Sequence, residues 1–108
     1  MRHFNALDLE TKINIRGMKT KELVHHDNAT IKIIMLDPNQ AIPDHQVPVD
    51  VTFYILKGSG TIKIENETYN VKKDDVVLCP PNTLMSVKGS EEGIQFINAK
   101  TPGIIVKK

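Results

Sequence analysis

The sequence contains no tryptophan and a single cysteine, Cys79. One cysteine cannot form an internal disulfide, so the chain is neither a disulfide-stapled secreted domain nor a cysteine-rich zinc module. An excess of one charge sign is also missing, because 14 Lys and Arg residues are balanced by 13 Asp and Glu residues, a net charge of +1. We therefore expect no nucleic-acid partner and no acidic membrane partner, since both favour a strongly basic surface.

Long hydrophobic segments are absent as well. No apolar run approaches the roughly 20 residues that span a bilayer, and the first ten residues, MRHFNALDLE, do not contain the apolar core of a signal peptide. The 108 residues are 40% hydrophobic and 25% charged, which is typical of one small globular domain. We expect residues 1–108 to form a single, soluble, cytoplasmic domain.

Short β-branched and aromatic segments alternate with turn residues along most of the chain. We expect strands at residues 30–37, 49–57, 61–65, 68–72, 76–79, 84–88, 94–99 and 104–106, interrupted by glycines at 58–60 and 89–93. Beyond one possible helical turn in the first dozen residues, no segment of ten residues follows a 3.6-residue period. The pattern predicts an all-β fold, closed into a barrel or jelly roll because closure hides strand edges.

Two motifs within residues 44–87 have the spacing of a known family. His45 precedes an apolar segment, Phe53 to Leu56, that leads to Gly58, and residues 73–82 read KDDVVLCPPN. This arrangement resembles the cupin family, whose first motif places His-x-His and a Glu before such a glycine. The second motif usually reads Gly-Asp, four residues, then Pro, and Asp74 replaces its glycine here; Asp tolerates the positive φ that glycine provides. The resemblance implies a cupin-like jelly-roll β-barrel or sandwich with its motif core at 44–87.

The resemblance also implies a metal centre, and the ligand positions differ from that expectation. His45 fits the first histidine, but Val47 and Val51 occupy the second histidine and glutamate positions, and Met85 occupies the later histidine position. Zinc, iron, manganese and nickel sites use three or four converging donors, mostly nitrogen and oxygen. We therefore expect no metal cofactor. The alternative is a divalent transition metal (Zn, Fe, Mn or Ni) held by a non-standard set that includes His45.

Three further residues are candidate helpers in that alternative. Asp50 is the carboxylate nearest to the lost glutamate, but strand alternation places it opposite Val51 unless a β-bulge intervenes. His25 and His26 are adjacent, so at most one of them points into the barrel. The competing interpretation is that one histidine is solvated and the other caps the turn at Asp27.

The two-residue period of the strands predicts the barrel interior. Apolar side chains would surround His45 there: Val47, Val51, Phe53, Ile55, Met85 and Val87. Apolar walls around one polar group are typical of a site for a small apolar molecule with one hydrogen-bonding head. The same residues also describe an ordinary filled core, and Cys79 is expected to be a small core hydrophobe rather than a nucleophile.

Three functions remain as alternatives. The first is a cupin-like module that binds a small organic ligand in an apolar pocket and has no metal centre. The second is a small metalloenzyme, a dioxygenase or isomerase, built around His45. The third is a metal-free isomerase or epimerase with His45 as the base; its acid would be Tyr54 or Tyr69, although Tyr54 should face away from the pocket. We also expect a homodimer formed through edge segments at 12–16 and 104–106.

Overall fold

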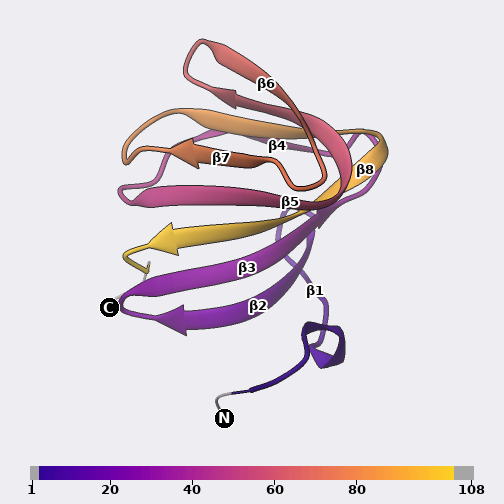
Figure 1. Ribbon diagram of the computed structural model, residues 1–108, viewed down its shortest axis with the longest axis vertical. Coiled ribbons are helices and arrows are strands. Elements are labelled where there is room, and N and C mark those ends of the chain that lie inside the picture. The colour runs from indigo at the N-terminus through magenta and orange to yellow at the C-terminus, as the bar shows by residue number, and fades with distance from the viewer. Residues whose placement is uncertain (1–2, 104–108) are drawn as a thin grey trace.

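The computed structural model describes residues 3–103 and shows an all-β fold (Figure 1). One short 3-10 turn, η1 (Ala6–Asp8), precedes eight strands: β1 (Lys12–Ile13), β2 (Lys19–His26), β3 (Ala29–Leu36), β4 (Ala41–His45), β5 (Asp50–Ile64), β6 (Glu67–Lys72), β7 (Val76–Cys79) and β8 (Met85–Thr101). The predicted fold class is confirmed. Within the described residues, no helix is long and apolar enough to cross a membrane.

The strands pair antiparallel in the order β1-β2-β3-β8-β5-β6, with β4 on β8 and β7 on β5. β5 and β8 pair with each other along most of their length. Asp50 lies opposite Thr101 at one end of this pairing, and Ile64 lies opposite Met85 at the other. Figure 1 shows both long strands curving at the right, so that the sheet folds over itself. The result is a jelly-roll barrel whose two halves share β5 and β8.

The bend in these strands lies where the sequence predicted that they would end. The strand breaks expected at 58–60 and 89–93 are wrong, since both segments continue within β5 and β8. β5 instead shifts register on either side of Gly58, whose φ is +78°, and a Cβ there would lie 2.2 Å from the Gly93 carbonyl oxygen. The glycines therefore allow two strands to bend in close contact.

Two strands were not predicted. β2 is rich in charged and polar residues, and β4 contains Pro43, which usually argues against a strand. β4 pairs only with β8, and its register shifts between Ile42 and His45, so Pro43 lies where no second neighbour needs its amide. Asp74 has a φ of +73°, as its place in the motif predicted. The strand predicted at 104–106 lies outside the described residues.

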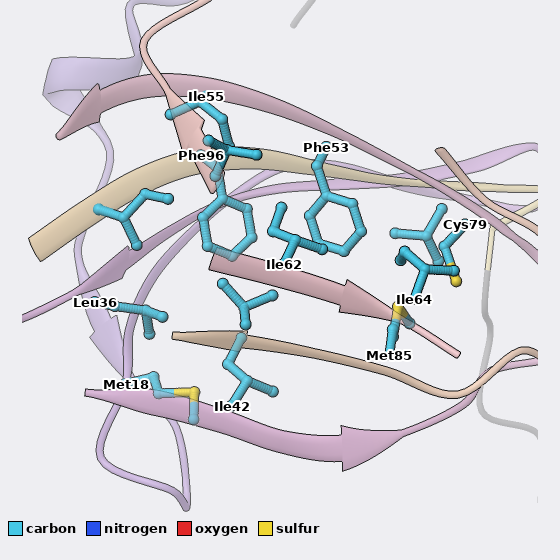
Figure 2. Close-up of a cluster of buried hydrophobic side chains, with 14 residues drawn as sticks. Met18, Leu36, Ile42, Phe53, Ile55, Ile62, Ile64, Cys79, Met85 and Phe96 are labelled. Atoms are coloured by element: carbon cyan, nitrogen blue, oxygen red, sulfur yellow. The ribbon is translucent and has the colours of Figure 1, made fainter. Parts of the chain in front are cut away.

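The core lies between the two halves of the barrel. Figure 2 shows its buried side chains as one cluster, with Cys79, Ile64 and Met85 at one end. The rings of Phe53 and Phe96 pack with their centroids 5.5 Å apart. Both phenylalanines are 1% exposed or less, so aromatic and branched side chains close the centre of the barrel.

Candidate functional site

The ends of several strands meet at one end of the barrel, which we call the His45 end. β2, β4, β7 and β8 finish there, and β3 and β5 begin there, at the left of Figure 1. His45 is half-buried and lies opposite Met85 in the pairing of β4 with β8. Its Nδ1 is 2.9 Å from the Pro43 carbonyl oxygen. A carbonyl can only accept, so Nδ1 donates, and Nε2 of the neutral ring keeps its lone pair.

The other three positions that the resemblance assigns to metal ligands present no matching donors. Val51 and Met85 are each 1% exposed and belong to the core cluster, and Val47 packs against that cluster. Valine offers no lone pair, and the thioether of Met85 is a soft donor that does not suit zinc, iron or manganese. Together with one imidazole, these residues do not fit the metal of the family.

The helper residues do not complete a ligand set either. Asp50 is exposed at the start of β5, and both histidines of β2 are exposed. Nδ1 of His26 accepts a hydrogen bond from the Asn28 amide at 3.1 Å, so this residue stabilises the turn after β2, as the alternative interpretation held. Nδ1 of His25 lies 3.6 Å from the Glu22 carboxylate. Among residues 3–103 no three His, Cys, Asp or Glu side chains form a group that could hold a metal ion.

The six side chains expected around the interior all lie in or on the core. Five of them are buried members of the core cluster and Val47 packs against it: Val47, Val51, Phe53, Ile55, Met85 and Val87. Their inward direction therefore follows the two-residue period. They do not line any of the three surface hollows described next, so their role in ligand binding stays a prediction.

The largest of these hollows lies at the opposite end of the barrel, beside the bend in β5 and β8. It measures about 790 Å³ and is lined in part by Lys57, Lys72, Lys73, Glu92 and Gly93. Two smaller hollows lie near Asn70, one toward Ser90 and one toward Leu78. None of the three is lined by one of the four metal-ligand positions, His45, Val47, Val51 and Met85.

Cys79 and the two tyrosines offer little chemistry to the His45 end. Cys79 is 2% exposed, and burial, followed by the charge of Glu65, raises the pKa of its thiol, which disfavours the nucleophilic thiolate. Tyr54 lies on the outer face and donates to the Asp74 carboxylate at 2.9 Å. Tyr69 donates to Glu67. These hydrogen bonds raise the pKa of both phenols. Neither tyrosine is thus placed as the acid partner of His45.

A row of polar side chains on β3 and β8 was not predicted from the sequence. Thr30 lies opposite Lys100, and Lys32 lies opposite Asn98. Residues directly opposite across a strand pair share a face of the sheet. On the other side of β8, Lys100 lies opposite Val51 and Asn98 opposite Phe53, both of which are core residues. We call these four residues, Thr30, Lys32, Asn98 and Lys100, the inner polar row, because they face into the barrel.

The inner polar row is partly shielded from water. Thr30 and Asn98 are 5% and 6% exposed, and the two lysines are half-buried. Lys100 donates from Nζ to Oδ1 of Asn98 at 2.9 Å. Burial of the amine, and then the charge of Lys32, lower the pKa of Lys100. Strand alternation could have revealed this row from the sequence. Alternate residues of a strand share a face, so Asn98 and Lys100 lie on the same face as Ile94 and Phe96, although a lysine is usually interpreted as exposed.

Comparisons with known proteins agree with this architecture. The structure of KdgF from Halomonas sp. matches at 17% sequence identity with a TM-score of 0.88, covering 96% of each chain. The conserved SPY1581 protein of unknown function from Streptococcus pyogenes matches at 27% identity with a TM-score of 0.76, covering 97% of this chain and 93% of that one.

A third structural match belongs to a larger enzyme. Oxalate decarboxylase of Bacillus subtilis, a protein with Mn(II) centres, matches at 19% identity with a TM-score of 0.80. The match covers 95% of this chain and 30% of that one. No curated protein sequence is similar enough to add to these comparisons.

The sequence itself matches the family model of the cupin domain. The match spans residues 32–92, which is more than half of the 108 residues and includes both motifs. The jelly-roll topology and the structural matches agree with it. The chain therefore belongs to the cupin domain family.

Proposed function

We propose that this cupin barrel is a binding module for a small organic ligand, which enters at the His45 end and binds without the usual metal centre. One observation supports this proposal above the others: half-buried polar groups of the inner polar row lie directly beside apolar positions of the barrel. Small-molecule sites combine apolar walls with a few convergent polar groups. Here Val47 and Val51 supply apolar wall, while Lys100 and Asn98 supply polar groups.

His45 adds a second polar contact on the facing half of the barrel. With Nδ1 donating to Pro43, Nε2 is left to accept a hydrogen bond from a hydroxyl or amide of the ligand. Partial exposure of His45, Val47 and Lys100 supports access from solvent at this end. The ligand would then lie between His45 on β4 in one half of the barrel and Asn98 and Lys100, near the end of β8, in the other half.

Metal content is the first test. Protein purified without chelators, and a His45→Ala variant, would be analysed by elemental mass spectrometry. We expect less than stoichiometric metal in both samples, because the donor set does not fit such an ion. A near-stoichiometric metal that disappears in His45→Ala would overturn the proposal in favour of a metalloenzyme.

Ligand binding is the second test. Amide and methyl NMR spectra would be recorded while a panel of small organic compounds is added. We expect binders to shift the signals of Val47, Val51, Asn98 and Lys100. Signals of Gly93 serve as an internal control, because this residue lines the hollow at the opposite end. If compounds shift only the control signals, or none bind, the proposed site is wrong.

A further inference from the structure

The inner polar row places two positive charges inside the barrel wall. Lys32 and Lys100 are diagonal neighbours on β3 and β8, since Thr30 pairs with Lys100 and Lys32 pairs with Asn98. Diagonal neighbours on one face of a sheet are near enough for long side chains to reach a common point. Both lysines are half-buried, and the charge of Lys32 acts on Lys100 strongly enough to contribute to the lowering of its pKa.

No acidic side chain of residues 3–103 neutralises this pair. In this part of the chain Lys19 forms an ion pair with Asp37, and His25 lies beside the Glu22 carboxylate; neither contact includes Lys32 or Lys100. Glu22 lies opposite Lys32 in the register, but its carboxylate is directed to His25 at 3.6 Å. The hydrogen bond that Lys100 makes goes to Asn98, a neutral amide that accepts through one oxygen.

Partly buried charges of one sign are unfavourable unless an opposite charge compensates them. Ammonium groups have three donors each, and Lys100 uses one of them on Asn98. Asn98 accepts from Lys100 through Oδ1, and its amide nitrogen carries two N–H donors on the same face. These donors lie on the face of the sheet that also carries Val51, and among residues 3–103 no acidic side chain forms an ion pair with either lysine.

We propose that Lys32 and Lys100 form an oxyanion site that binds the carboxylate or phosphate group of a small organic ligand. Each lysine would donate a charge-assisted hydrogen bond, and Asn98 would hold the Lys100 amine in place. The apolar part of the ligand would lie against Val51 and Val47. This inference rests on the proposed function, because it names the ligand class for the same His45 end.

The test compares matched anionic and neutral probes. Butyrate, inorganic phosphate and butyramide would be titrated into the full chain at constant ionic strength, followed by NMR. Butyramide has nearly the size of butyrate without its charge, so it reports binding that does not need an oxyanion. We expect butyrate or phosphate to bind about tenfold or more tightly than butyramide, a typical effect of charge-assisted hydrogen bonds.

Variants then locate the site. Lys100→Met and Lys32→Met remove the charge at similar length, Lys100→Arg retains it, and Lys63→Met is the matched control at an exposed position of β5. We expect the anion preference to fall about tenfold in Lys100→Met, to fall in Lys32→Met, and to persist in Lys100→Arg and Lys63→Met. Amide spectra of each variant would confirm that it is folded.

Each outcome separates this inference from the proposed function. Anions that bind no better than butyramide, or an equal loss in Lys63→Met, overturn the oxyanion site. If butyramide or other neutral compounds still bind at the His45 end in that case, the proposed function stands alone. If no compound of either charge binds there, both are wrong. Comparing the affinities of butyrate and inorganic phosphate then shows which oxyanion, carboxylate or phosphate, the site prefers.

Discussion

Single residues at the His45 end determine which chemistry the barrel can perform. Three positions that hold metal ligands in the resemblance carry Val47, Val51 and Met85, whereas polar groups at this end include Asn98 and Lys100 on β8. Two predictions follow at this scale, one for the lysine and one for the missing ligands.

The first concerns the pH dependence of stability. The pKa of Lys100 is lowered below its ordinary value of 10.5, by burial and by Lys32. Between the folded and unfolded pKa values the unfolded chain binds more protons, so the free energy of unfolding rises with pH over that window. We expect the wild type to gain stability relative to Lys100→Met as the pH rises toward about 10.

Urea unfolding of both proteins at a series of pH values measures this difference. The other charged groups on this face, Lys32, Glu22 and His25, are the same in both proteins and largely cancel in the comparison. So do Tyr54 and Tyr69, whose raised pKa values lower stability at still higher pH. A stability difference that is constant with pH would contradict the account of Lys100.

The second prediction restores the ligands of the family. A variant that combines Val47→His, Val51→Glu and Met85→His with the native His45 should bind Mn(II) or Zn(II), because four donors then occupy the motif positions. Without metal it should lose about 2–5 kcal/mol of stability, since Val51 and Met85 are 1% exposed and polar groups would be buried there.

Elemental mass spectrometry and thermal unfolding with and without Mn(II) check both parts. Added metal should raise the melting temperature of the restored variant by binding its folded state. The same variant with His45→Ala is the control and should bind less. Failure of the restored variant to bind metal would mean that the backbone no longer has the geometry of a ligand site.

Sequence reasoning succeeded for apolar residues at this scale and failed for the lysines. The inward direction of Val51, Phe53 and Ile55 follows from strand alternation alone. The inward direction of Lys100 follows from the same alternation, but it contradicts the usual preference of lysine for water. Its burial depends on pairing with β3 and β5, which no local pattern contains.

At the scale of elements, the glycines at the bend are the informative case. Gly58 and Gly17 both have positive φ, +78° and +80°. A Cβ at Gly58 would meet the Gly93 carbonyl at 2.2 Å, whereas a Cβ at Gly17 would meet nothing within 4 Å. The two sites therefore separate backbone strain from steric contact.

We expect Gly17→Ala to destabilise the protein by about 1 kcal/mol, the cost of a left-handed conformation for alanine. Gly58→Ala should cost about 3 kcal/mol or more, because the strands must also move apart. Chemical denaturation of the two variants gives both values. Equal losses would show that the close approach of β5 and β8 is not maintained.

The same glycines explain the main error in the predicted elements. Glycine is a typical turn residue, so Gly58 and Gly93 led to the prediction that the strands end there. They are instead bulges and bends, which have the same local signature as a turn. Most other strand positions agree within a few residues, because their β-branched segments are bounded by Pro or Asn.

At the scale of the whole molecule, the homodimer remains a prediction. β1 lies at the edge of the sheet; its residue Ile13 is 69% exposed, and Ile15 just after it is 103% exposed. Ile15→Lys should leave the monomer unaffected and weaken association, since Ile15 makes no buried contact within the chain. Sedimentation velocity over a range of concentrations measures the effect.

Leu78→Lys on β7 is the matched control, because Leu78 is 68% exposed and lies on a different strand. If Leu78→Lys weakens association and Ile15→Lys does not, the dimer forms elsewhere than the predicted edge. If the wild-type protein stays monomeric at micromolar concentration, the predicted homodimer is wrong.

The shared strands β5 and β8 also determine how the barrel opens. Each strand contributes to both halves, so neither half keeps its hydrogen-bonded partners if the other separates. Opening should therefore be all-or-none, and formation should be slow, because the pairs join residues far apart in the sequence. In native-state hydrogen exchange, we expect amides along β5 and β8 to share one protection free energy, equal to that of global unfolding, while β1 exchanges first.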